Sequence, residues 1–567
     1  MDGTSVLAHP SDANGSSQAT APVAPRSVSK TPAPTAAPIQ REQREKKDSL
    51  KKREASSTST TLGKRKAQNA SITYPSPQRF AVPPPRAQDF ERPKEDVFSE
   101  HEPVPFVVPG SNLQLYKPQD LAENKRGYRY QRAIADPLFP HKQFYRCTSP
   151  APHAARLSFE DSDKSMHFSK DALITTNEKG WRMARGNVCA REGTLYYEIK
   201  IHKGIPATGP LNEAVGPAPH VRFGWARREA PLDAPVGFDG YSYGLTDMRF
   251  ETMHRSRPGR FFHSKKGPKP KGVKLAPGAP TTITLPPEHQ HVKEGDVIGV
   301  EIQLPSLNLH QKIVSGVYNP AVDIGDGFEE SETGPVLTGQ DDTPADVIRD
   351  RIAISYKSSI YFEILDYVST KPMENYADRT QSLTSFSGGV SSLSKDAVKS
   401  PPNPNHEHIG LRTLPHSAIR VYKNGMLIGT AFENLLAFLP PASQPSKQLG
   451  ARDGNFDDGL LGYFPAVACF FGGIAEVNFG DGKDGFWAAP PHIRSGTMSS
   501  DQRDGDVEMS DGAKSTRAWF PGSTPRAAGE RYKEQIAEDV VYDLVDEVDF
   551  FMQDGGVDGK VGQGQQA

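Results

Sequence analysis

The sequence Leu195-Tyr-Tyr-Glu-Ile-Lys-Ile201 carries the clearest secondary-structure signal in the chain. Apolar Tyr197 and Ile199 alternate with charged Glu198 and Lys200, and a period of two is the pattern of a half-buried β-strand. Comparable runs, rich in β-branched and aromatic residues, recur between turn signals at His220–Trp225, Val297–Ile302, Ile352–Tyr356, Ile360–Ile364, Ile419–Tyr422, Ala466–Phe470 and Ile474–Phe479.

Two of these strands are joined by a recognisable turn. Asn424-Gly425 lies between Arg420–Lys423 and Met426–Phe432, and this dipeptide favours a type I′ hairpin because both turn residues need a positive φ. At least eight strands and no long helical period predict an all-β fold, an antiparallel β-sandwich with long loop insertions.

Composition limits how much of the chain can fold. Gly and Pro number 50 each, or about 18% of 567 residues, against roughly 12% in average proteins. Only 36% of the residues are hydrophobic and the net charge is −2. We therefore expect one folded domain with flanking segments: a disordered basic and Pro-rich tail over 1–110, the sandwich over 111–490, a linker over 491–528, a helix over 529–553 and a flexible tail over 554–567.

Several classes of protein are excluded on the same basis. The three cysteines, Cys147, Cys189 and Cys469, are too far apart in sequence for a zinc finger or a disulfide scaffold. The most apolar stretch, Leu460–Ala475, is shorter than the ~20 residues that span a bilayer, so no membrane partner is expected. No phosphate-binding, HExxH or nucleophile-elbow motif occurs. The sequence thus predicts a protein that is not an enzyme and holds no cofactor or metal.

One helix is predicted near the end of the chain, over Glu530–Met552. Apolar residues recur every three or four positions and form a broad stripe, while Asp and Glu fill the other side. Two interpretations stay open: the stripe packs on the chain's own sandwich, or it enters a groove of another protein. The candidate contact residues are Ile536, Val540, Val541, Leu544 and Val548.

A second candidate site combines an arginine with aromatic residues. Arg222 and Trp225 are followed by Pro235, Phe238 and Tyr243. An arginine among aromatic rings suits an acidic peptide, because the guanidinium pairs with carboxylates while the rings cover apolar parts. The alternative is that Trp225 and Tyr243 belong to the core and Arg222 is an ordinary surface charge.

These residues belong to an ordered set of motifs: Asn177–Gly186, Gly193–Glu198, Arg222–Trp225, Ala234–Tyr243, Gly295–Gly299, Tyr422–Met426, Tyr463–Ala466 and Val477–Gly480. Their order resembles a SPRY (B30.2-type) domain, and with the terminal helix it resembles the fungal Bre-two/Ash-two type of SPRY subunit of COMPASS, the histone H3 lysine-4 methyltransferase complex.

The resemblance implies a scaffold that stimulates a SET-domain methyltransferase. Its SPRY surface would bind an acidic segment of a WD-repeat subunit, and its helix a Dpy-thirty-type dimer. The implied peptide-binding residues are Trp181, Arg222, Pro235 and Phe238. The chain departs from the family where two basic positions fall on Thr246 and Met248, which weakens the implied grip on acidic residues. The alternative is a nuclear SPRY protein that binds RNA or serves as a ubiquitin-ligase adaptor.

Two basic segments complete the predictions. The clusters Arg41–Arg53 and Lys64–Lys66 resemble a bipartite nuclear import signal, which places the protein in the nucleus, although a solvated tail has the same composition. Residues 252–287 contain no Asp or Glu, so we expect an exposed basic loop that is either solvated or in contact with nucleosomal DNA. The candidate DNA contacts are Lys265, Lys266, Lys269 and Lys271.

Overall fold

The structure is a computed structural model, and it describes residues 82–90, 105–107, 113–116, 122–123, 129–139, 144–147, 152–207, 218–259, 291–328, 352–356, 358–364, 367, 369–377, 400–443, 457–482, 485–493 and 525–553. All of them belong to one compact unit that spans residues 73–567. The candidate DNA contacts between Lys265 and Lys271 and both N-terminal basic clusters lie outside the described residues.

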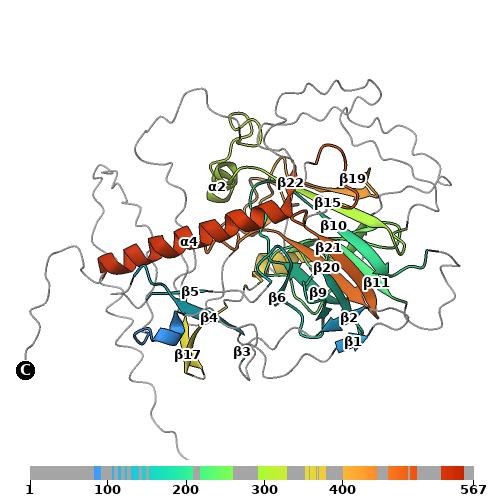
Figure 1. Cartoon of the computed structure of the whole chain (residues 1–567). Helices are drawn as coiled ribbons and strands as arrows, with labels where there is room; N and C mark the ends of the chain where they lie inside the picture. Colours follow the sequence, from blue (N-terminus) through green and yellow to red (C-terminus); the bar gives the residue numbers. More distant parts are fainter. Residues whose placement is uncertain are drawn as a thin grey trace, which may run out of the picture. The chain divides into compact units, whose positions relative to one another are not determined.

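The largest sheet has ten strands (Figure 1). In spatial order they are β1 (Pro105–Val107), β2 (Gln114–Tyr116), β7 (His167–Phe168), β8 (Ile174–Asn177), β21 (Gly473–Asn478), β10 (Gly193–Lys203), β15 (Val297–Leu304), β18 (Ala418–Lys423) and β19 (Met426–Glu433), and β22 (Arg526–Ala527) adds to β10.

The second sheet has seven strands, and in spatial order they are β14 (Arg257–Gly259), β13 (Thr252–His254), β12 (Ser242–Thr246), β11 (His220–Ala226), β20 (Phe464–Phe470), β9 (Arg182–Gly186) and β6 (Leu157–Ser162). A smaller sheet contains β16 (Ala353–Tyr356), β17 (Ser359–Glu363), β4 (Arg129–Ala135), β3 (Ala122–Glu123) and β5 (Tyr145–Cys147). Except for β22 on β10, all the strand pairs named in these sheets are antiparallel.

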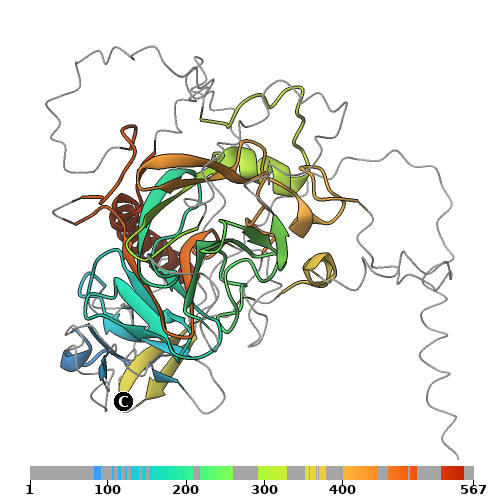
Figure 2. The same ribbon diagram turned by 90° about the vertical axis from the view of Figure 1, so that its right-hand side faces the viewer.

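The main core lies between the two large sheets, which curve around it (Figure 2). Tyr197 and Ile199 of β10 point into this core from one sheet, and Val221 and Phe223 of β11 point into it from the other. The predicted antiparallel β-sandwich is therefore confirmed. The expectation that the 195–201 strand is only half-buried needs correction, because Glu198, on the opposite face, is also buried and accepts hydrogen bonds from the backbone of residues 487 and 488.

The predicted hairpin forms where the sequence places it. Asn424 and Gly425 have φ values of 49° and 80°, and they join β18 to β19. Both angles lie in the left-handed region, which Asn and Gly reach at low cost.

The described helices are η1 (Ala87–Asp89), α2 (Leu307–Ser315), α3 (Lys371–Ala377), η6 (Ile409–Leu411) and α4 (Ala528–Gln553). The sequence reading missed α2, which is too short for a long periodic signal. Its ends follow standard rules, because the Ser306 hydroxyl accepts a hydrogen bond from the Leu309 N–H and Gly316 ends the helix with a φ of 79°.

Three short elements lie inside segments that the sequence predicts to be tail or linker. η1 and β1 lie inside the segment expected to be tail, and β22 lies inside the expected linker. β22 forms because the backbone at Arg526–Ala527 pairs in parallel with Leu195–Tyr196 of β10. Two-residue and three-residue strands carry no readable period, so pairing partners distant in sequence decide where they form.

Candidate functional site

Arg222 lies on the outer face of the second sheet. Along β11 the side chains alternate, so Val221, Phe223 and Trp225 enter the core while Arg222 points away from it. Its paired neighbours in the sheet are Thr246 of β12 and Ala468 of β20. Trp225 is completely buried, which agrees with the interpretation that it belongs to the core.

The guanidinium of Arg222 rests on an aromatic ring. It lies 4.7 Å from the centroid of Trp181, and the Trp181 ring stacks on Phe470 with centroids 5.0 Å apart and planes at 28°. Among the residues that the structure describes, Arg222 has no hydrogen bond or ion pair. Its N–H groups are therefore available to a bound carboxylate.

The electrostatic surroundings of Arg222 are mixed. Burial lowers the pKa of its guanidinium, whereas the nearby carboxylates of Asp247 and Glu251 act to raise it. Asp247 itself accepts a hydrogen bond from the Val221 N–H at 3.0 Å and lies 3.0 Å from Nδ1 of His220. The hydrogen bond between the side chains of His220 and Asp247 is the main reason why the pKa of His220 is raised. Asp247 is thus hydrogen-bonded to His220 and to the Val221 backbone, and it forms no hydrogen bond with the Arg222 guanidinium.

Pro235 and Phe238 form the two ends of one turn on the same face of the sheet. The Phe238 N–H donates to the Pro235 carbonyl at 3.1 Å. The turn lies close over β12, since a Cβ on Gly244 would meet the Val236 carbonyl oxygen well inside normal contact. Phe238, the last residue of the turn, is 51% exposed.

The four predicted peptide-binding residues therefore occupy one face but form two pairs. Trp181 and Arg222 touch each other, and Pro235 and Phe238 share the neighbouring turn. The sequence reading missed Phe470, whose ring supports Trp181. Its position at the end of an apolar strand, 289 residues further along the chain, offers no signal by itself.

The predicted partner helix α4 is fixed at its beginning. Gly529 N–H donates to the Phe479 carbonyl at 2.8 Å. The Gln535 side chain accepts from the Cys189 N–H at 3.0 Å, and its amide donates to the Asn187 carbonyl at 3.2 Å. Arg531 forms an ion pair with Glu538 along the helix. The first two turns are thus attached to the sandwich through hydrogen bonds.

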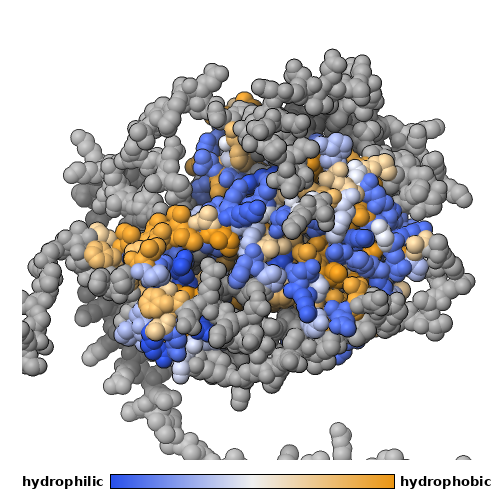
Figure 3. All heavy atoms as spheres, in the orientation of Figure 1, coloured by the Kyte–Doolittle hydropathy of each residue, from blue (hydrophilic) through white to orange (hydrophobic). Residues whose placement is uncertain are grey.

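The apolar stripe of α4 faces outward instead of packing on the sandwich. Val541, Val545 and Val548 are 55%, 47% and 53% exposed, and Figure 3 shows apolar side chains gathered along this helix. Of the predicted contact residues, Ile536, Val541 and Val548 are exposed, while Val540 and Leu544 are half-buried. Most of the stripe is therefore exposed in the described helix, and Val540 and Leu544 are covered in part.

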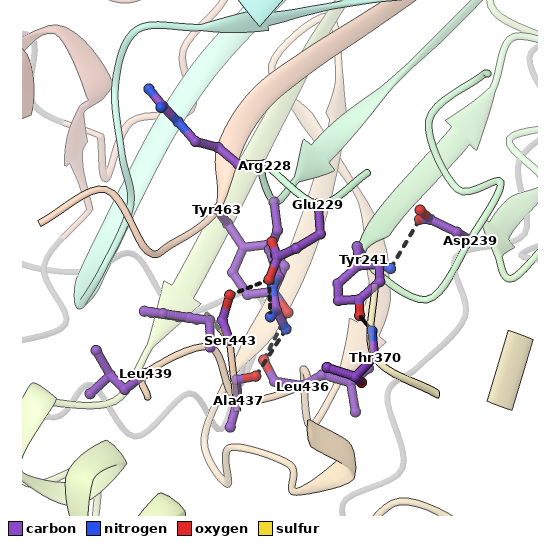
Figure 4. Close-up of polar contacts among 12 residues, drawn as sticks. Arg228, Glu229, Asp239, Tyr241, Thr370, Leu436, Ala437, Leu439, Ser443 and Tyr463 are labelled. Carbon is purple, nitrogen blue, oxygen red and sulfur yellow. Dashed lines mark hydrogen bonds and ion pairs between the residues drawn. The ribbon is translucent and has the colours of Figure 1, made fainter. Parts of the chain in front are cut away.

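A buried polar network that begins directly after β11 contains several charged groups. Arg227 pairs with Glu229 at 2.6 Å and donates to the Ala437 carbonyl at 2.9 Å, and Figure 4 shows Ser443 directed at Glu229. Tyr241 accepts from the Thr370 N–H at 3.0 Å. Because these groups satisfy one another, the network serves to hold loops in place.

Other expected features lie partly outside the described residues. Of the predicted basic loop, Arg255 and Arg257 are described, and they belong to the β13–β14 hairpin. Within the described ranges, no group of three His, Cys, Asp or Glu residues could hold a metal ion. None of the described helices combines the length and apolar character needed to cross a bilayer.

Comparison with known proteins finds relatives along most of the chain. The COMPASS component cclA of Colletotrichum higginsianum is 43% identical over 552 residues, which cover 95% of this chain and 88% of the relative. The COMPASS component cclA of Aspergillus fumigatus is 39% identical, with 92% of this chain and 75% of the relative covered. The Set1 complex component ash2 of Schizosaccharomyces pombe is 31% identical, with 92% and 58% covered.

Two further comparisons add less. No family model matches the sequence. A solved human SPRY domain and the SPRY domain of human HERC1 each cover 56% of this chain, and 95% and 96% of their own chains, at 11% and 10% identity. Their TM-scores of 0.20 and 0.21 are too low to add to the fold assignment.

Proposed function

Because the chain belongs to the family of COMPASS and Set1 complex components, we propose that it is a non-catalytic scaffold subunit of a histone H3 lysine-4 methyltransferase complex. In this proposal the sandwich binds an acidic segment of the WD-repeat subunit, and α4 binds a Dpy-thirty-type dimer. The assembly stimulates the SET-domain methyltransferase and so regulates transcription in the nucleus.

The observation that carries the proposal is the outward apolar face of α4. Its first turns are attached to the sandwich, yet Val541, Val545 and Val548 are about half exposed. A continuous apolar stripe in solvent is unfavourable and typically marks a protein-binding surface. A groove between two helices of a small dimer offers the complementary shape.

The Arg222 surface supports the acidic partner. The guanidinium lies on Trp181 and has no acceptor among the described residues, so an incoming carboxylate can pair with it without breaking an existing bond. Arg222→Ala should weaken binding of the WD-repeat subunit by roughly 1.5–3 kcal/mol, the range for a hydrogen bond to a charged group. Calorimetry with unchanged affinity would remove Arg222 from the interface.

Reconstitution tests the function as a whole. The SET-domain, WD-repeat and Dpy-thirty-type subunits are assayed on histone H3 peptide with and without this chain. We expect the chain to raise the methylation rate, and to show no methylation when it is alone. Methylation by the purified chain itself would contradict the scaffold role.

The alternative is a nuclear SPRY protein that binds RNA or serves as a ubiquitin-ligase adaptor, and it assigns no role to α4. It is tested by affinity purification of the full chain followed by mass spectrometry. Recovery of SET-domain and WD-repeat proteins supports the scaffold, whereas recovery of ligase subunits or splicing factors supports the adaptor.

A further inference from the structure

A second arginine rests on an aromatic ring near the Pro235–Phe238 turn. The guanidinium of Arg255 lies 3.7 Å from the centroid of Tyr376 in α3, and its Nη1 donates to the Tyr376 carbonyl at 2.7 Å. This arrangement repeats the contact of Arg222 with Trp181. Flat stacking on a ring fixes the guanidinium plane and reduces the entropy lost when it binds a carboxylate.

Arg255 is joined directly to the turn that carries Phe238. The Arg255 N–H donates to the Asp239 carbonyl at 2.8 Å. The next residue, Ser256, donates from its hydroxyl to the Phe238 carbonyl, also at 2.8 Å. The hairpin and the turn therefore form one connected surface.

The two arginines lie on opposite sides of this turn, Arg222 within β11 and Arg255 in the two-residue turn that joins β13 to β14, where its φ is 55°. Arg222 pairs with Thr246, and four residues further along these strands Ala226 pairs with Ser242. β13 pairs Met253 with Gly244, so Arg255 follows in the row of Ser242. Four residues of ~3.3 Å and two strand spacings of ~4.8 Å separate the Cα atoms of the arginines by roughly 16 Å. An extended peptide covers that distance in about five residues.

The charge of Arg255 is less compensated than that of Arg222. Burial lowers the pKa of Arg255, the hydroxyls of Tyr376 and Tyr243 act to raise it and Arg257 lowers it further, and no carboxylate of the described residues contributes. Among the described residues, only the Tyr376 carbonyl accepts a hydrogen bond from its side chain. The positive field at this end of the surface is thus directed at solvent or at a partner.

We propose that Arg255 is the second cationic anchor for an acidic peptide, so that one extended segment binds Arg222 and Arg255 through two acidic residues about five positions apart. The segment crosses the Pro235–Phe238 turn, where the exposed Phe238 ring contacts it. Arg255 thereby replaces the basic residues that are absent at positions 246 and 248. This inference rests on the proposed function, because the occupant is the acidic segment of the WD-repeat subunit.

The test uses the full chain and fluorescently labelled synthetic peptides of that acidic segment, with each Asp or Glu replaced in turn by Asn or Gln. Binding is measured by anisotropy for Arg222→Gln and Arg255→Gln. Lys312→Gln is the control of equal charge, because Lys312 is an exposed residue of α2, outside the proposed site, and pairs with Asp323 in the loop that follows the helix. Arg255→Lys tests whether charge without the planar fork suffices.

We expect Arg255→Gln to weaken binding on the order of tenfold or more, as for loss of a charge-assisted hydrogen bond. One acidic substitution in the peptide should have no further effect in this variant, and the substitution that couples to Arg222 should lie about five residues away. Lys312→Gln should bind normally, and Arg255→Lys should retain part of the affinity.

The remaining outcomes separate the two proposals. If Arg222→Gln weakens binding and Arg255→Gln does not, the second anchor is wrong while the peptide site stands. If neither variant binds more weakly, the peptide site itself is wrong. If Arg255→Gln lowers the melting temperature and no peptide residue couples to it, Arg255 only ties α3 to the hairpin and the inference is overturned.

Discussion

Truncation of the exposed valines of α4 should abolish most of its affinity for a partner. The perturbation is the triple change Val541→Ala, Val545→Ala and Val548→Ala, which leaves the helix backbone and its charges intact. Alanine has a higher helix propensity than valine, so the helix itself should be at least as stable. Since all three side chains are about half exposed in the free chain, their removal costs the fold little.

The expected loss of affinity follows from their exposure. Full burial of a Val side chain is worth about 1.5–3 kcal/mol, and these side chains still expose 55%, 47% and 53% of their surface. Because alanine retains one of the three carbons of each side chain, the loss is about 0.5–1 kcal/mol per site. The three together weaken binding by about 1.5–3 kcal/mol, or roughly 10- to 150-fold in Kd.

Isothermal titration of the full chain with the purified Dpy-thirty-type subunit measures this loss. A matched control replaces Val317, Val322 and Ile324, which are 66%, 73% and 78% exposed in the loop after α2, with alanine. The control should bind normally, and both variants should melt near the wild-type temperature. An α4 variant that binds within twofold of wild type, or a control that loses affinity equally, would refute the outward-face argument.

Three further predictions concern the sandwich and its basic segment. Gly244→Ala should push the turn at Val236 away from β12 and lower the free energy of unfolding by about 1–3 kcal/mol, as overpacking does. It should also weaken binding of the acidic peptide, measured by anisotropy. His220→Gln should lower the free energy of unfolding by about 0.2–1 kcal/mol at pH 5.5–6 and by less at pH 9. The hydrogen bond with Asp247 raises the pKa of His220 in the folded chain, so protonated His220 stabilises the fold below its unfolded pKa. This stabilisation is lost as the pH rises through the folded pKa. Replacing Lys265, Lys266, Lys269 and Lys271 with Gln should flatten the salt dependence of nucleosome binding. The slope of log K against log salt should fall by about 0.9 per lost phosphate contact. Activity on H3 peptide should not change.

The parts of the fold that could be predicted are those with a local signal. The alternation at residues 195–201 predicts β10, and the Asn424-Gly425 dipeptide predicts the β18–β19 hairpin, because in each case a few adjacent residues determine the conformation. The periodic stripe of the last helix is local too. The sequence does not show whether this stripe faces solvent or the sandwich, because that depends on the face of the helix that Gln535 attaches to Cys189.

The candidate site was predictable only in part for the same reason. Arg222 and Trp181 were connected by resemblance to a family, and 41 positions separate them in the sequence. Tyr376 lies 121 positions from Arg255, outside every motif on which the sequence prediction depends. No pattern within either segment indicates that the rings and the guanidinium groups will meet, because tertiary packing alone brings them together.

The pairing of β22 with β10 fixes the rotational phase of α4. Because the backbone enters the helix straight from a strand that is hydrogen-bonded to Leu195–Tyr196, the helix cannot turn about its own axis. Each residue inserted between Ala527 and Gly529 would rotate the apolar face by about 100°. One insertion there should turn the valine face away from its docking direction. The number of residues between β22 and the first turn of α4 therefore sets which way the binding face points.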